Sequence, residues 1–169
     1  MNATLQFWNT AEVEPARDAM IACCGSQRWA AAMVAKRPIG SVLELSESAD
    51  RIWSTMEEAD WLEAFACHPR IGKHKSPHAS AQSVAWSSQE QSSASSAAER
   101  VLDELANGNE RYERRFGFTY IVCATGKSAE EMLVILNRRL LSDREAELRE
   151  AAEQQRQITQ IRLGKWLAE

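Results

Sequence analysis

Residues that break helices are scarce in this sequence. The 169-residue chain has only 7 glycines and 4 prolines. Alanine, glutamate, glutamine and leucine are abundant, and these residues favour helix over sheet. A chain of this length can bury a core without disulfides or bound metals. The composition therefore predicts an all-α fold: a single compact multi-helix domain, residues 1–169, of about seven or eight helices.

The sequence also lacks long apolar runs and an excess of positive charge. No stretch approaches the roughly 18 apolar residues of a membrane helix, and MNATLQFWN has no basic segment ahead of an apolar one. The formal net charge is −4, which argues against a protein that mainly neutralises nucleic-acid phosphates. We therefore expect a cytoplasmic protein that binds neither membrane nor nucleic acid.

Cysteine is present, but not in a metal-binding or disulfide pattern. The four cysteines form no C-x-x-C pair, and no histidine lies at zinc-finger spacing from them; they are Cys23, Cys24, Cys67 and Cys123. We interpret them as buried or incidental thiols.

Apolar residues recur at helical spacing over most of the chain. Ser128 and Glu131 have capping-box spacing, as do Ser142 and Glu145. The helices predicted from these signals cover residues 11–24, the stretch around Trp29 that ends near Pro38, residues 41–56, a segment capped by Asp60, residues 89–112, and the two segments behind the capping boxes. The apolar run 116–124 (FGFTYIVCA) predicts either a buried strand or a buried extended link between helices.

Residues 68–96 form the longest stretch without a helical pattern. They include nine serines, Pro69, Gly72 and Pro77, with few large apolar groups. Long loops in compact domains are often functional. The alternative is a disordered surface insertion, and length and composition do not separate the two.

His68 is the most informative candidate for chemistry. Pro69 disfavours the α region at His68, so we expect this histidine to be extended at the end of its helix. The unperturbed pKa of a histidine side chain lies near neutrality, and Arg70 and Lys73 supply positive charge that suits an anionic ligand. The plainer interpretation is a histidine that ends a helix at the solvent.

Two further residues are candidates, each with a structural alternative. Glu90 follows Ser87 at capping-box spacing, so it either caps a helix or presents a carboxylate from a first turn toward the cavity of His68. Arg162 lies one position from the apolar stripe of the last helix. It either reaches water along its aliphatic stem or offers its guanidinium fork to a carboxylate or a ureido carbonyl.

Three histidines, His68, His74 and His78, lie within eleven residues. No acidic ligand lies between them, and the segment is rich in proline and serine. We therefore expect no metal site here.

Taken in order, these segments resemble the 2-oxo-4-hydroxy-4-carboxy-5-ureidoimidazoline (OHCU) decarboxylase family from about Phe7 to Trp166. HPRIG, residues 68–72, is the most specific match. The others are Phe7-Trp8-Asn9, Cys24-Gly25-Ser26 with Trp29, Arg37-Pro38, Ser87-x-x-Glu90-Gln91, Asn109-x-x-Tyr112-x-x-x-Phe116-Gly117-Phe118, Gly126-Lys127-Ser128, Arg139-Leu140, Glu145 and Ile158-x-x-Ile161-Arg162-Leu163. The departures are Tyr120, where another aromatic is common, and the serine-rich loop after Gly72.

The resemblance implies an all-helical homodimer without a metal or an organic cofactor. It implies conversion of OHCU to (S)-allantoin with loss of carbon dioxide, in urate catabolism, and a functional link to hydroxyisourate hydrolase. It assigns catalytic roles to His68 and Glu90. The substrate-binding residues that it implies are Arg162, Pro69, Ser87, Phe118 and Ile121.

Two other functions remain as alternatives. A non-catalytic helical interaction module would have no cavity behind His68, and small ureides would not change its thermal stability. A metal-dependent hydrolase built on His68, His74 and His78 would carry a metal that a chelator removes.

Overall fold

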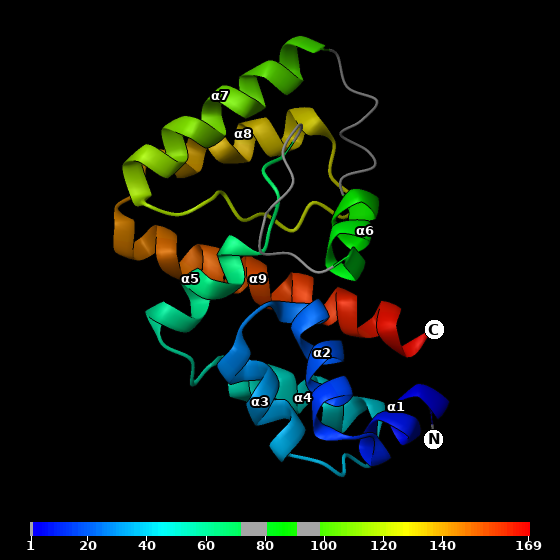
Figure 1. Cartoon of the computed structure of the whole chain (residues 1–169). Coiled ribbons are helices and arrows are strands. Elements are labelled where there is room, and N and C mark those ends of the chain that lie inside the picture. Colours follow the sequence, from blue (N-terminus) through cyan, green and yellow to red (C-terminus); the bar gives the residue numbers. More distant parts are fainter. Residues whose placement is uncertain (1, 72–80, 91–98) are drawn as a thin grey trace. The chain divides into compact units, whose positions relative to one another are not determined.

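Nine α-helices make up the regular structure of residues 2–71, 81–90 and 99–169, which the computed structural model describes (Figure 1). The helices are α1 (Ala3–Thr10), α2 (Val13–Cys24), α3 (Gln27–Ala35), α4 (Val42–Trp53), α5 (Glu58–Ala66), α6 (Ala81–Glu90), α7 (Glu99–Phe116), α8 (Ala129–Arg139) and α9 (Arg144–Leu167). These ranges contain no strand. The all-α prediction is confirmed, and the expected number of seven or eight helices was too low by at least one.

The chain divides into two compact units. One comprises Met1–Ala64 and Arg156–Glu169, and the other comprises Phe65–Gln155. The long helix α9 contributes residues 144–155 to the second unit and residues 156–167 to the first.

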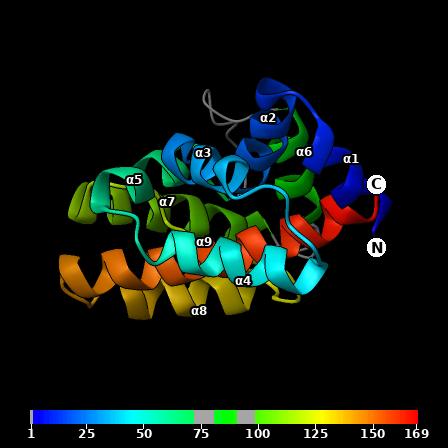
Figure 2. The same ribbon diagram turned by 90° about the horizontal axis from the view of Figure 1, so that it is seen from below.

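In the first unit, α2 packs against α3 and α3 against α4 (Figure 2). Trp29 of α3 is fully buried, and its Nε1–H donates to the Ala49 carbonyl of α4 at 3.1 Å. Ser26 and Ser41 cap α3 and α4, because each hydroxyl accepts from the backbone N–H three residues later. Buried tryptophan and serine caps thus fix this three-helix arrangement.

In the second unit, α7 packs against α8 at close range. Gly108 of α7 makes this approach possible, since a Cβ there would lie 2.5 Å from Leu136 Cδ2 of α8. Ser128 and Glu131 cap α8 reciprocally, as their spacing predicts.

Phe116 is the last residue of α7, and residues 117–124 of the apolar run form a link with neither strand nor helix, which settles the choice that the sequence left open. Gly117 has φ of 85°, a left-handed conformation that ends α7. Side chains bond the link in place of a neighbouring strand. Gln154 Oε1 accepts from the Cys123 N–H at 2.8 Å, and Lys127 Nζ donates to the Cys123 carbonyl at 2.7 Å.

Several sequence-based boundaries are wrong. Residues 81–90 are helical (α6) although they fall in the predicted loop, and the next helix, α7, begins at Glu99. The N-terminal helix α1 was not predicted. Asp143, not Ser142, caps α9, because its Oδ1 accepts from the Ala146 N–H at 2.8 Å. Asp60 lies inside α5, where its carboxylate accepts from the Glu57 N–H at 2.9 Å.

None of the helices within the described ranges is both long enough and apolar enough to cross a membrane.

Candidate active site

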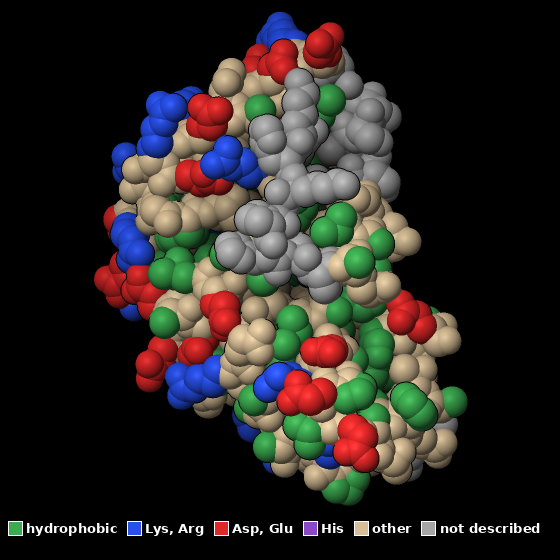
Figure 3. Space-filling view, viewed as in Figure 1, with side chains coloured by type: hydrophobic (Ala, Val, Ile, Leu, Met, Phe, Trp, Pro, Cys, Tyr) green, Lys and Arg blue, Asp and Glu red, His purple; other side chains and the backbone are tan. Residues whose placement is uncertain are grey.

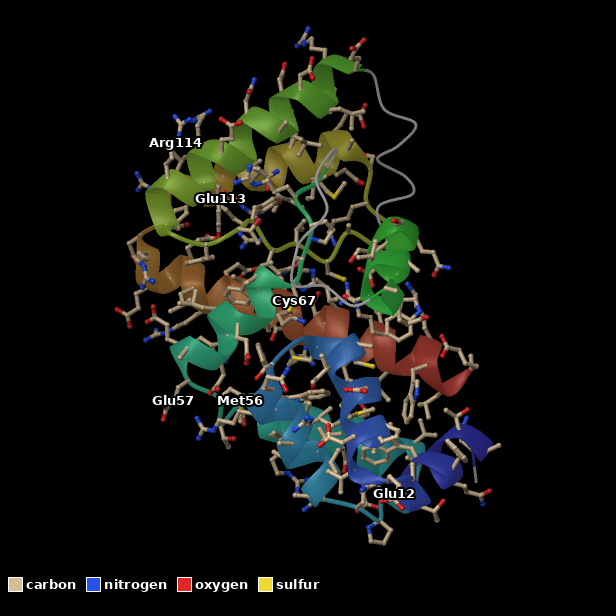
Figure 4. The ribbon with its side chains drawn as sticks, viewed as in Figure 1. Glu12, Met56, Glu57, Cys67, Glu113 and Arg114 are labelled. Carbon is tan, nitrogen blue, oxygen red and sulfur yellow. The ribbon has the colours of Figure 1, made fainter. Side chains whose placement is uncertain are left out.

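His68 lies two residues beyond the end of α5. Its N–H donates to the Phe65 carbonyl at 3.1 Å, which closes a last turn, and Pro69 cannot continue the helix. Figure 4 labels the preceding residue, Cys67, at this end of α5. His68 itself is half-buried. The sequence therefore placed this histidine correctly at a helix end, and it does not project fully into solvent.

The imidazole of His68 contacts a side chain that the sequence did not single out. Its Nε2 lies 2.6 Å from Gln155 Oε1. Gln155 has no exposed surface and lies within α9. A short contact to a buried amide holds the ring in one orientation.

Arg70 does not offer the free positive charge expected beside His68. Its Nε donates to Glu113 Oε1 at 2.8 Å, and its Nη2 donates to Glu113 Oε2. This forked pair with α7, where Figure 4 labels Glu113, raises the pKa of Arg70 above its usual value. Arg70 therefore fixes the chain after His68 to Glu113 of α7. Lys73, the other expected positive charge, lies outside the described residues.

Two other exposed arginines of this unit are also compensated locally. Arg114 pairs with Glu110, and Arg149 with Glu145, each at i,i+4 spacing. On the face drawn in Figure 3, positive and negative side chains of the described residues are interspersed.

Phe118 and Ile121, both implied to line the pocket, are buried in the extended link at 7% and 1% exposure. The Phe118 ring lies 5.5 Å from that of Phe65 and 5.7 Å from that of Tyr112. Since Phe65 belongs to the last turn of α5, this aromatic cluster joins the helix that leads to His68 with the link.

A buried polar network fixes the same link. Arg139 Nη1 donates to the Ile121 carbonyl at 2.5 Å, and Arg139 Nε donates to Glu147 Oε1 at 2.5 Å. The Tyr112 hydroxyl donates to the same carboxylate oxygen at 2.5 Å. Burial is the largest single effect and lowers the pKa of Arg139, but the hydrogen bond to Glu147 and the nearby charges of Glu147, Tyr112 and Tyr120 together raise the pKa above its usual value. The network holds the guanidinium of Arg139 against the backbone carbonyl of Ile121.

The expected geometry of Ser87 and Glu90 is wrong. Both lie in the second half of α6 (Ala81–Glu90), so neither begins this helix. The capping interpretation failed because Ala81, Val84 and Trp86 extend the helix upstream. Ser87 and Glu90 are nevertheless buried, at 2% and 9% exposure, and one turn separates them on α6.

Arg162 is 1% exposed, so it does not extend to solvent. It lies in the part of α9 that belongs to the first unit. Burial raises the pKa of the Cys23 thiol well above its usual value, and the positive charge of Arg162 partly opposes this increase. Cys23, Cys24 and Cys123 are buried, as interpreted, and Cys67 is half-buried.

The described residues hold no group of three histidine, cysteine or acidic side chains suited to a metal ion. His74 and His78 lie outside the described residues.

Comparisons with known proteins agree over almost the whole chain. The family model for OHCU decarboxylase matches residues 9–164. A crystal structure of OHCU decarboxylase in the presence of (S)-allantoin superimposes with a TM-score of 0.78 and 33% identity, over 94% of this chain and 100% of that one. A structure of (S)-allantoin synthase gives a TM-score of 0.71 at 17% identity, over 96% of this chain and 53% of that one, and supports the fold alone.

Two curated relatives are longer proteins. The uric acid degradation bifunctional protein TTL of Arabidopsis thaliana is 36% identical over 90% of this chain and 48% of its own length. The uric acid degradation bifunctional protein PucL of Bacillus subtilis is 29% identical over 80% of this chain and 26% of its own length. The chain thus spans about half or less of these relatives.

Proposed function

Because this chain belongs to the OHCU decarboxylase family, we propose that it removes carbon dioxide from OHCU and releases (S)-allantoin. The observation that carries this proposal is the fold-wide similarity to an OHCU decarboxylase whose structure was determined with (S)-allantoin. The reaction is a step of urate degradation, in keeping with the names of the curated relatives.

The proposed substrate supplies its own electron sink. Its carboxylate is on a carbon that also bears a hydroxyl and adjoins a ring C=N. When the bond to carbon dioxide breaks, the electron pair moves into the ring and toward that nitrogen. The ring nitrogen takes up a proton from solvent. The hydroxyl oxygen loses its proton and becomes the carbonyl of allantoin, and the neighbouring carbon, which bears the ureido group, takes up a proton. No organic cofactor is needed to hold the electron pair.

The protein has to move protons and shield one face of the intermediate. We assign the acid/base role to His68, which would take the hydroxyl proton and return a proton to carbon. Glu90 would orient the ureido or ring N–H groups, and Arg162 would bind a carboxylate or carbonyl through its fork. Both assignments follow from the family resemblance, and each of the two side chains is buried within its own unit.

The remaining contacts would come from Pro69, Ser87 and the extended link. Phe118 would present an apolar wall, and the backbone at Ile121 would bind polar groups of the substrate. Arg139 supports this role for the link, because a bonded carbonyl cannot shift when substrate enters.

The test is circular dichroism of OHCU generated freshly from urate by urate oxidase and hydroxyisourate hydrolase. Rapid appearance of a lasting (S)-allantoin signal with this protein supports the proposal. Slow decay to racemic allantoin, at the rate seen without protein, would reject it and favour the interaction module. Loss of activity after chelation, together with bound metal, would favour the hydrolase.

The role of His68 has its own test. A positioned acid/base contributes about 10²–10⁴ in rate, so His68→Asn should lower kcat by that factor while the far-ultraviolet spectrum stays unchanged. A folded variant with near-normal turnover contradicts the assignment.

We also propose a homodimer formed through α8. One exposed stripe of this helix is acidic at its start (Glu130), apolar at Val134 and basic at Arg138. Val134 is 68% exposed, and Leu141, in the turn that follows α8, is 84% exposed. A two-fold axis that passes through Val134 perpendicular to α8 makes the two copies of the helix antiparallel. It places Arg138 of each copy against Glu130 of the other, because both lie four residues from the axis.

Sedimentation of Val134→Glu tests this interface. We expect the variant to be monomeric, whereas Leu43→Glu, at an equally exposed position on α4, stays dimeric. A monomeric wild-type protein, or a dimeric Val134→Glu, contradicts the proposal. A cytoplasmic location and supply of substrate by hydroxyisourate hydrolase also remain predictions, tested by cell fractionation and by coupled assay.

A further inference from the structure

The contact between His68 and Gln155 restricts where the imidazole carries its proton. The atom of Gln155 that faces Nε2 is the side-chain oxygen, at 2.6 Å. An amide oxygen accepts hydrogen bonds and cannot donate them. The contact is therefore a hydrogen bond only when Nε2 carries a proton, which makes Nδ1 the basic nitrogen of the neutral ring.

Burial makes this restriction stringent. Gln155 has no exposed surface, and a buried amide oxygen that faces an unprotonated ring nitrogen would be costly. The residue lies in the middle of the 24-residue helix α9, so its backbone is held on both sides. A buried group on a rigid helix keeps a partner's orientation better than one on a loop.

We propose that Gln155 is a positioning residue that holds His68 in the Nε2–H tautomer, so that Nδ1 exchanges protons with the substrate. This inference rests on the proposed decarboxylase function for its catalytic meaning, but the tautomer itself is a property of the free protein.

The neutrality of Gln155 is part of the argument. A carboxylate at this place would stabilise the imidazolium form and hold the proton on the ring. An amide supplies the same acceptor without a full charge, so it does not hold the proton on the ring. Glutamine therefore suits a histidine that has to return the proton it takes.

Nitrogen chemical shifts of the imidazole rings test the tautomer directly. The chain has only three histidines, so protein labelled with ¹⁵N-histidine gives three ring systems, and His68→Asn identifies the signal of His68. We expect a protonated Nε2 and an unprotonated Nδ1 at high pH. A proton on Nδ1, with Nε2 bare, would overturn the inference whatever the enzyme does.

Two substitutions separate positioning from structure. Gln155→Leu should lower kcat about tenfold or more, part of the ~10²–10⁴ that a positioned acid/base supplies, and should give a mixture of tautomers. Gln155→Glu should move the His68 titration, and the acidic limb of the pH–rate profile with it, upward by about one pH unit or more.

Gln160→Leu is the matched control. Gln160 lies on the same helix and bonds Ser46 and Asp50 of α4, so its loss tests general weakening of α9. We expect the tautomer and the pH profile of His68 to stay unchanged in this variant. An equal effect of both leucine variants would make Gln155 merely structural and would overturn the inference.

The failures of the two proposals are distinguishable. A wild-type protein without decarboxylase activity but with His68 as the Nε2–H tautomer rejects the function and retains the positioning. An active enzyme in which His68→Asn abolishes turnover, while Gln155→Leu changes neither the tautomer nor kcat, rejects the positioning and retains the function.

Discussion

Replacing Arg139 with methionine should destabilise the protein by about 3–5 kcal/mol, the cost of removing one partner of a buried ion pair. Arg139 is 4% exposed and donates to Glu147, to the Ile121 carbonyl and, at 3.4 Å, to the Tyr112 hydroxyl. Methionine fills most of the same volume, so the cavity contribution is small. The dominant cost is the carboxylate of Glu147, which is 1% exposed and loses its cation.

Urea unfolding followed by circular dichroism measures this loss. Arg149→Met is the control, because Arg149 is 72% exposed and its pair with Glu145 should contribute less than about 0.5 kcal/mol. The double variant Arg139→Met/Glu147→Leu should regain most of the lost stability, since no charge stays buried. A loss below about 1 kcal/mol for Arg139→Met, or no recovery in the double variant, would refute the reasoning.

Two further predictions concern helix packing and pH. Gly108→Ala should lower the free energy of unfolding by about 1–3 kcal/mol, because the added Cβ would overlap Leu136. Gly164→Ala, which has no atom within 4 Å of the added Cβ, should raise it by about 0.5–1 kcal/mol. Thermal melts in which both variants shift the melting temperature in the same direction would contradict this. Burial raises the pKa of both tyrosines of the chain, Tyr112 and Tyr120, although Arg139 opposes it. Their contribution to stability is complete below pH ~10, where unfolded tyrosine titrates, and is lost as the pH rises toward the folded-state pKa. Tyrosinate absorbance should therefore appear together with unfolding, and tyrosinate in a folded protein near pH 10 would be inconsistent with it.

The sequence predicted the helices best where local signals agree. Ser128 and Glu131 supply both halves of a capping box, and α8 begins where they predict. Ser142 and Glu145 have the same spacing, yet Asp143 caps α9 instead, because two acceptors compete within two residues. Ser87 and Glu90 show the limit of the motif, since a capping-box spacing also occurs within a helix that has already begun.

His68 could be located from the sequence because its position depends on its neighbour. Pro69 ends α5 through local sterics, and local sterics need no knowledge of the fold. The partner of His68 could not be found this way. Gln155 is 87 positions away along the chain, and nothing in its neighbours distinguishes it from the other glutamines of α9.

The polar residues inside α9 nevertheless leave a pattern. Glu147, Gln155, Thr159 and Arg162 are all buried, and successive members are eight, four and three residues apart, which keeps them on one face of the helix. A search for apolar stripes treats each of them as an interruption. Burying four polar groups on one helix is costly unless each is bonded, so such a face indicates that the surrounding structure supplies partners. Glu147 bonds Arg139 and Tyr112, and Gln155 bonds His68. Polar positions that continue an apolar stripe therefore indicate side chains that bond other residues inside the protein.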